Sequence, residues 1–297
     1  MTADAWVAIR QAEPSLRKGE RLVARFVLDN PEAVLEMAIG QLADSTGTSQ
    51  STILRFCKNL GYSGYREFRL AMARSVDREE SQRDRFSIEH GEINESDTAE
   101  QVVAKVAYNE ARTIEQTAQF LDLAAVERVV SAMAEADRIE LYGIGSSALA
   151  CQDMQQKLHR IGLLAFAWSD AHLALTSAAL LTPRSVAIAV SYTGLTIETN
   201  HALEVAASTG ATTVAITNYP DSPLAELADE ALLTMARETK FRSGAMSSRI
   251  AQLAVIDILF IRLVQRVYDQ ASQSLKRTYD AVQHHRIPPG RPPKSSR

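Results

Sequence analysis

The chain has few cysteines and no long hydrophobic run. Two cysteines, Cys57 and Cys151, occur in 297 residues, and each lies in an apolar helical pattern. We expect free thiols in the core rather than a disulfide, as in a reducing compartment. No stretch of about 18 apolar residues occurs, so no membrane span is predicted. The start of the chain lacks a basic region followed by an apolar run, so we expect no secretory signal and a cytoplasmic protein.

A strong excess of positive charge is also absent, since 32 Lys and Arg face 36 Asp and Glu, and the net charge is −4. This balance excludes a protein that coats nucleic acid with its whole surface. Basic residues nevertheless gather in segment 49–74, where Glu67 is the single acidic residue and the basic ones are Arg55, Lys58, Arg66, Arg69 and Arg74. Such a strip is typical of a DNA-binding module and also of an ordinary solvated face, so charge alone does not distinguish these two interpretations.

The hydrophobic period divides the chain into two parts. Residues 1–78 have helical spacing, with helices expected at 34–39, 39–44, 49–60 and 65–74, and a long helix is expected at 99–120. Short apolar runs then alternate with helical segments, at 138–142, 163–167, 185–190, 212–217 and 230–235, before a final strong helix at 248–267. This alternation predicts an α/β domain, a parallel sheet flanked by helices, after a separate all-α helix-turn-helix domain.

Composition sets the expected limits of these domains. Residues 77–98 are polar and charge-rich, as in a linker, and the end of the chain is rich in proline and basic residues. We expect the helix-turn-helix domain over 1–77, a linker over 78–98, the α/β domain over 99–280 and a disordered tail over 281–297.

Segment 39–56 has the pattern of two short helices that cross steeply. Ala43 is small enough for the helix contact, and Gly47 tolerates the positive φ of a tight turn. Ile53 and Phe56 form the inner face of the second helix, which Thr48 or Ser49 caps. The candidate DNA-binding residues are the cap and the outer face: Ser49, Gln50, Ser51, Thr52, Arg55 and Lys58. Short polar groups reach base edges and cations meet phosphates, whereas the alternative is a helical hairpin with a wet outer face.

The same segment resembles the helix-turn-helix of the RpiR-type regulators. The resemblance rests on a specific ending of the second helix, formed by Arg55, Phe56, Cys57, Lys58, Leu60, Gly61, Tyr62 and Gly64. It implies binding to double-stranded operator DNA.

Two loops follow predicted strands in the second half. The first contains Gly143, Gly145, Ser146 and Ser147, and it lacks the third glycine of a dinucleotide-binding loop. Its glycines and helix start suit an anion, although a tight turn has the same composition. The second contains Ser191, Thr193 and Thr196 around one glycine, at the carboxyl end of a strand, where ligands bind in open α/β sheets. The alternative for its hydroxyls is helix capping.

This pair of loops resembles the SIS (sugar isomerase) domain, whose phosphate loop reads Ser-x-Ser-Gly-x-Thr. The resemblance implies phosphate contacts from four residues, with Ser146 nearby: Ser147, Ser191, Thr193 and Thr196. Thr193 departs from the usual Ser, which keeps the hydroxyl and adds a methyl. Segment 241–257 also resembles the end of RpiR-type chains, so the two resemblances cover nearly all of residues 10–270.

Three further residues are candidates for ligand or interface contacts: Glu198, Arg242 and Arg249. Glu198 is either a general base or a polar residue of a helix's first turn. The arginines either bind ligand or form ordinary salt bridges. The histidines have no metal-ligand spacing, so we predict no metal, no cofactor and no catalytic residue.

These observations predict a transcriptional regulator of sugar-metabolism genes that responds to a sugar phosphate effector. Two recognition helices would match two half-sites, so a homodimer or a higher homo-oligomer is expected. Two alternatives remain, a phosphosugar isomerase with Glu198 as base and a SIS sensor that binds a protein partner through its helical head.

Overall fold

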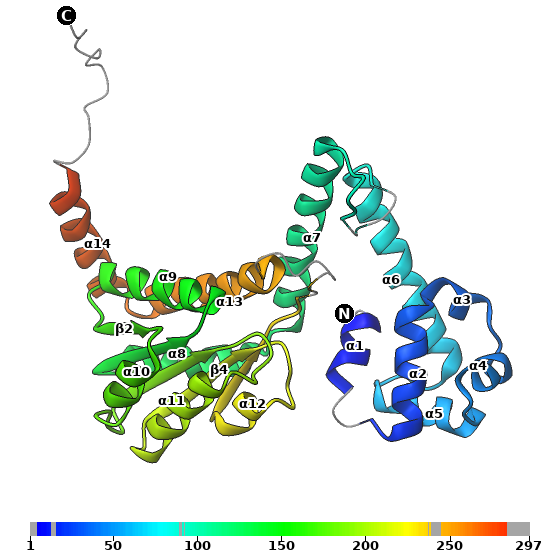
Figure 1. The fold of residues 1–297 in the computed structure, drawn as a ribbon, viewed down its shortest axis with the longest axis horizontal. Helices are drawn as coiled ribbons and strands as arrows, with labels where there is room; N and C mark the ends of the chain where they lie inside the picture. The colour runs from blue at the N-terminus through cyan, green and yellow to red at the C-terminus, as the bar shows by residue number, and fades with distance from the viewer. Residues whose placement is uncertain are drawn as a thin grey trace, which may run out of the picture. The chain divides into compact units, whose positions relative to one another are not determined.

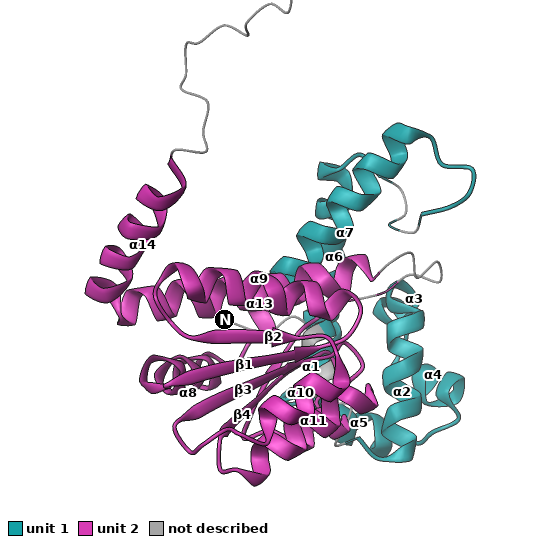
Figure 2. Ribbon diagram, turned by 60° about the vertical axis from the view of Figure 1, so that its left-hand side comes forward, with its two compact units in different colours: residues 1–116, 239–241 teal, residues 117–238, 242–297 magenta. Residues whose placement is uncertain are grey.

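The computed structural model describes residues 5–12, 16–88, 91, 93–236, 238 and 245–283. The chain forms two compact units, residues 1–116 with 239–241 and residues 117–238 with 242–297 (Figure 2). None of the helices in the described part has the length and apolar character that crossing a bilayer requires.

The first unit is all-helical, as predicted. Its helices are α1 (Ala5–Ala12), α2 (Lys18–Asp29), α3 (Pro31–Glu36), α4 (Ile39–Thr46), α5 (Gln50–Asn59), α6 (Tyr65–Arg85) and most of α7 (Ala99–Phe120). Ile53 and Phe56 on α5 are fully buried in one core with Phe68 and Met72 of α6. The rings of Phe56 and Phe68 meet edge to face with 5.5 Å between centroids. This core fixes α5 against the rest of the unit.

Helix α6 is longer than predicted. The expected end at residue 74 is wrong, because α6 continues to Arg85. Residues 77–85 are polar but rich in Glu, Gln and Arg, which are good helix formers, so charge density did not indicate a break. The segment predicted as a linker therefore begins inside a helix, and the predicted limits of the domains otherwise stay a prediction.

The second unit contains a five-stranded parallel sheet in the order β2-β1-β3-β4-β5. The strands are β1 (Arg138–Gly143), β2 (Ala165–Trp168), β3 (Ser185–Val190), β4 (Thr212–Thr217) and β5 (Glu230–Leu233), which confirms the five predicted strands. The chain runs from β1 outward to β2 and returns to β3 on the other side of β1. The strand order therefore reverses between β1 and β3, and Gly143 pairs in register with Val190 at the carboxyl ends of these strands.

Helices cover both faces of the sheet (Figure 1). One face packs against α8 (Leu123–Glu135), α9 (Ser146–Arg160) and α13 (Met246–Arg266), through Ile139 and Leu141 of β1. The other packs against α10 (Ala171–Ala178), α11 (Ile197–Ser208) and α12 (Pro223–Leu227). On that second face β3 presents Ala187 and Ala189, whose small side chains let α11 lie close to the sheet.

The last described helix, α14 (Tyr268–Gln283), was not predicted as a separate element. It overlaps the first residues of the predicted tail, whose remainder lies outside the described residues. Cys57 and Cys151 are free and buried, as predicted. Burial raises the pKa of each thiol to about 12, which keeps both protonated near neutral pH.

Candidate functional site

The turn between α4 and α5 has the geometry that the sequence predicts. Gly47 ends α4 in the left-handed region with φ of 62°, and Ala43 is buried at the helix contact. Ser49 is the N-cap of α5, and its Oγ accepts a hydrogen bond from Thr52 N at 3.2 Å. The start of α5 is thus held in a defined direction by the turn and its cap.

The outer face of α5 presents most of the candidate DNA-binding residues to solvent. Five of the six are exposed: Ser49, Gln50, Ser51, Arg55 and Lys58. The prediction that Thr52 belongs to this face is wrong, since Thr52 is buried. Its Cγ2 lies 3.2 Å from the position that a Cβ would take on Gly19 of α2, so it packs between the helices.

Arg55 has a partner on another helix. Its Nε lies 3.7 Å from Oε1 of Glu20 in α2, and its Nη2 donates to Thr52 Oγ1 at 3.4 Å. The Arg55 side chain is 54% exposed, whereas that of Glu20 is 1% exposed. The guanidinium therefore bridges a buried carboxylate and the solvent.

The other basic residues of the strip differ in their surroundings. Lys58, Arg66 and Arg74 are exposed. Arg69 donates from Nη1 to Met37 O at 3.3 Å and lies over the Tyr65 ring at 6.0 Å, so it helps to fix α6. The exposed members leave a basic surface on and next to α5.

In the first loop of the second unit, where β1 passes into α9, the position of Gly143 has no room for a side chain. A Cβ on Gly143 would lie 2.8 Å from Cys151 Sγ and 3.0 Å from backbone atoms of Ser147. Gly145 has φ of 64° and is the N-cap of α9, so no side chain caps the first N–H groups of this helix. These free N–H groups beside Ser146 suit an anionic ligand.

The second loop brings its hydroxyls together. Ser191 is buried at the end of β3, and its Oγ lies 3.1 Å from Thr196 Oγ1 and accepts from Gly194 N at 3.2 Å. Thr193 Oγ1 accepts from Leu195 N at 3.2 Å. Thr196 is the N-cap of α11 but makes no side-chain capping bond. Capping therefore does not account for the Thr196 hydroxyl, which faces Ser191 instead.

Both loops lie at the same edge of the sheet, at the point where the strand order reverses. They follow the adjacent strands β1 and β3, whose last residues pair in register. Buried oxygens near these loops have no hydrogen-bond partner among the described residues, namely Thr199 Oγ1, Asn200 Oδ1 and Gln252 Oε1. Hydroxyls, free helix N–H groups and these unpartnered oxygens together make a polar site.

Gln252 is a residue that sequence reasoning missed. It lies on α13, is 1% exposed, and donates from Nε2 to Ser147 Oγ at 3.1 Å. The two residues are 105 positions apart, and a single glutamine in an apolar helix gives no signal of this contact.

The remaining candidates are less closely connected to the loops. Glu198 is exposed in the first turn of α11, and no hydrogen bond to its carboxylate is found within the described residues. This position matches the helix-dipole interpretation better than that of a positioned base. Arg249 is half-buried in the first turns of α13, and Arg242 lies outside the described residues. The part of the chain that the structure describes has no cluster of three or more metal-ligating side chains.

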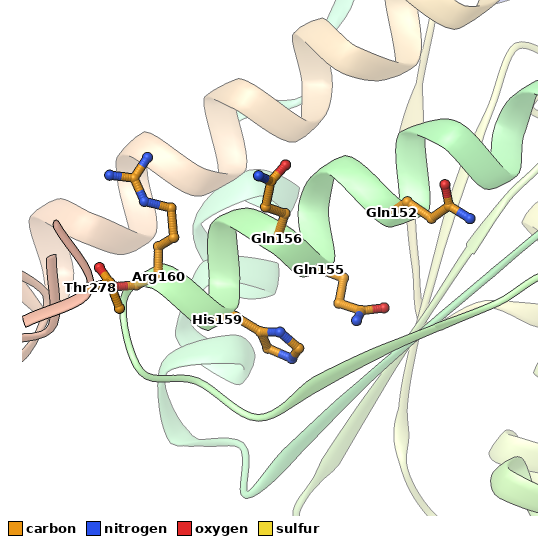
Figure 3. Close-up of a pocket in the computed structure, with 6 residues that line it drawn as sticks. All are labelled: Gln152, Gln155, Gln156, His159, Arg160 and Thr278. Atoms are coloured by element: carbon orange, nitrogen blue, oxygen red, sulfur yellow. The ribbon is translucent and has the colours of Figure 1, made fainter. Parts of the chain in front are cut away.

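A cavity of about 410 Å³ lies elsewhere, along α9 (Figure 3). Its lining consists of Gln152, Gln155, Gln156, His159, Arg160 and Thr278. Gln155 Oε1 accepts from Ala167 N at 2.6 Å, and His159 Nε2 lies 2.7 Å from Ala165 O. These two side chains bind backbone groups of the edge strand β2. This structural role accounts for two of the polar side chains in the lining without a ligand.

Comparison with known proteins identifies the families of both units. The model of the helix-turn-helix domain of the rpiR family matches residues 5–79, and the model of the SIS domain matches residues 132–262. An uncharacterized HTH-type transcriptional regulator of Caldanaerobacter subterraneus subsp. tengcongensis is 35% identical over 284 residues, which are 96% of this chain and 99% of that protein.

Solved structures agree with this assignment. Vibrio vulnificus NanR complexed with ManNAc-6P is 28% identical with a TM-score of 0.60, over 95% of this chain and 100% of that chain. The sugar isomerase domain of an RpiR transcription factor from Sphaerobacter thermophilus is 26% identical with a TM-score of 0.56, over 61% and 99%. The chain belongs to the rpiR family of helix-turn-helix transcriptional regulators and carries a SIS domain.

Proposed function

We propose that this regulator binds operator DNA through α5 and a sugar phosphate through the two hydroxyl loops of its SIS domain. The observation that carries the proposal is the paired arrangement of the loops at the reversal of strand order, with hydroxyls and uncapped helix N–H groups at one edge. The likeness to NanR, solved with ManNAc-6P, supports a sugar phosphate as the ligand class.

In this proposal five hydroxyl side chains bind the phosphate group: Ser146, Ser147, Ser191, Thr193 and Thr196. N–H groups at the starts of α9 and α11 add to the attraction for the anion. The site needs no metal and no cofactor, and the protein is a sensor rather than an enzyme. The exposed position of Glu198 supports this, because isomerisation needs a base held against the substrate.

On DNA, the cap and first turn of α5 supply contacts to base edges through Ser49, Gln50 and Ser51. Arg55 and Lys58 bind phosphates. A second copy of the chain supplies the second recognition helix, so the binding unit is a homodimer on two half-sites. The sugar phosphate changes DNA affinity because it binds more tightly to one of two conformational states, of which only one is competent to bind DNA.

Fluorescence anisotropy tests this function. The full chain is titrated onto a labelled duplex from upstream of its own gene, and onto unrelated DNA, with and without a panel of sugar phosphates that includes ManNAc-6P. We expect specific binding that one sugar phosphate alters and its unphosphorylated sugar does not. Equal affinity for both duplexes, together with turnover of a sugar phosphate, would instead favour the isomerase.

A further inference from the structure

We infer that Glu20, a buried carboxylate of α2, positions the guanidinium of Arg55 for contact with DNA phosphate. The inference rests on the proposed DNA binding through α5. It assigns a role to a residue that lies outside the recognition helix and is too deeply buried to touch DNA itself.

The contacts of Glu20 divide between its two oxygens. Oε2 accepts from Arg17 N at 2.9 Å, at the start of α2, and from Asn59 Nδ2 at 3.2 Å, at the end of α5. Oε1 lies 3.7 Å from Arg55 Nε. The first two bonds fix the carboxylate between the helices, so that Oε1 is held in one direction toward Arg55.

The charges explain why Arg55 stays in this orientation. A carboxylate that is 1% exposed is unfavourable without a cationic partner, and within the described residues Arg55 is the cation that pairs with it. Arg55 also donates from Nη2 to Thr52 Oγ1, on the same helix. Two contacts therefore restrain the guanidinium before any DNA arrives, which lowers the entropy that binding would otherwise cost.

The planar guanidinium is suited to serving both partners at once. Its Nε edge faces Glu20, and its other N–H groups belong to a side chain that is 54% exposed. Arginine has five donors in a rigid fork, whereas lysine has one compact ammonium that cannot face both sides. A positive charge at residue 55 is therefore not enough to contact Glu20 and a DNA phosphate together, and this arrangement requires arginine.

The test is a double-mutant cycle in DNA affinity, with anisotropy on the duplex from upstream of the gene. We expect Glu20→Gln to weaken binding about tenfold, equal to about 1.4 kcal/mol. A loss of affinity distinguishes a positioning role from a simple effect of charge, because removal of a negative charge near DNA would by itself strengthen binding. In the Arg55→Ala background, Glu20→Gln should cause no further loss, because its effect passes through Arg55.

Two controls accompany the cycle. Glu32→Gln makes the same change of charge at an exposed position of α3 and should leave affinity unchanged or slightly higher. Arg55→Lys keeps the charge, and we expect it to lose about tenfold in affinity because the fork is lost. Since Arg55 is exposed, this variant remains informative even if Glu20→Gln unfolds the domain, which circular dichroism detects.

The outcomes separate this inference from the proposed function. If the wild-type chain does not prefer the duplex, and genome-wide selection of bound fragments finds no other site, DNA binding itself is refuted. If the wild type binds but folded Glu20→Gln binds equally or more tightly, the positioning role alone is overturned. Equal losses from Glu20→Gln in both backgrounds, or wild-type affinity of Arg55→Lys, would overturn it as well.

Discussion

Gln252 on α13 donates a hydrogen bond from Nε2 to the Oγ of Ser147, in the first turn of α9. Because Ser147 Oγ accepts this bond, its own hydrogen is available to donate to a phosphate oxygen. Gln252 therefore orients a hydroxyl of the proposed ligand site from a neighbouring helix.

We expect Gln252→Leu to weaken sugar phosphate binding about tenfold, as for the loss of one buried hydrogen bond. Isothermal titration calorimetry with the sugar phosphate found by anisotropy measures this change. Gln265→Leu, at an exposed position of the same helix, is the matched control. Unchanged affinity of Gln252→Leu would contradict the orienting role.

Gly194 in the second loop has no space for a side chain. A Cβ there would lie 2.2 Å from Ser222 Oγ, and its φ of 65° is strained for other residues. We expect Gly194→Ala to destabilise the chain by about 2 kcal/mol or more, measured by urea unfolding. Gly64→Ala is the control, because Gly64 has an extended φ of 177° and no neighbour within 4 Å of the added carbon. Similar losses from both variants would argue against a steric cause.

Glu140 on β1 is fully buried, and four side chains donate to its carboxylate. Ser177 Oγ and Trp168 Nε1 each lie at 2.7 Å, Tyr142 OH lies at 3.1 Å, and Arg138 forms an ion pair. Burial, and then the charge of Glu140, hold the pKa of Tyr142 above its usual range. We expect Glu140→Leu to cost about 3–5 kcal/mol of stability, because the buried donors of Ser177 and Tyr142 lose their acceptor and Arg138 loses its ion pair.

The exposed pair Asp137 and Arg184 provides the comparison for this prediction. Their side chains are 60% and 71% exposed, and the Arg184 guanidinium lowers the pKa of Asp137 through hydrogen bonds. Asp137→Asn should cost far less stability than Glu140→Leu, because solvent screens such exposed pairs. A cost for Glu140→Leu as small as that for Asp137→Asn, in the same urea unfolding experiment, would refute the importance of the buried network.

Glu67 in the first turn of α6 accepts hydrogen bonds from Ser63 Oγ and Ser63 N, which lower its pKa below the ordinary value of 4.5. A lowered pKa in the folded state means that the ionised form adds stability above pH 4.5, and that this stability is lost as pH falls through the folded-state pKa. We expect Glu67→Gln to lower the melting temperature near neutral pH. The difference from wild type should shrink in acid, and a difference independent of pH would exclude the ionised bond as its source.

Lys58 is exposed on the outer face of α5 and, in our proposal, binds a phosphate. Lys58→Gln should weaken binding to all duplexes similarly and reduce the slope of log affinity against log salt by about 1. Gln50→Ala should instead reduce discrimination between specific and unrelated DNA. Anisotropy at several salt concentrations distinguishes the two effects, and an unchanged slope for Lys58→Gln would remove Lys58 from the phosphate contacts.

Local patterns predicted most of the fold. The five strands followed from short apolar runs, the first four of them bounded by Gly, Pro, Ser or Asn, and the turn between α4 and α5 followed from Ala43 and Gly47. Contacts between distant segments were beyond such patterns. Thr52 lies on the apparent outer face of α5 by spacing, but α2 crosses it and buries it. Gln252 reaches Ser147 only because α13 packs on α9. The phosphate contacts themselves stay a prediction.

The small side chains of Ala187 and Ala189 lie between the sheet and α11, whose N-cap is Thr196. Their size sets the distance between the sheet and α11, because a close-packed interior cannot accommodate an added methyl group without movement. A larger residue in this layer would lift α11 and carry the Thr196 hydroxyl away from Ser191. Substitutions of these core alanines can therefore change the ligand preference of this SIS domain, although they replace none of the residues that we propose to contact the ligand.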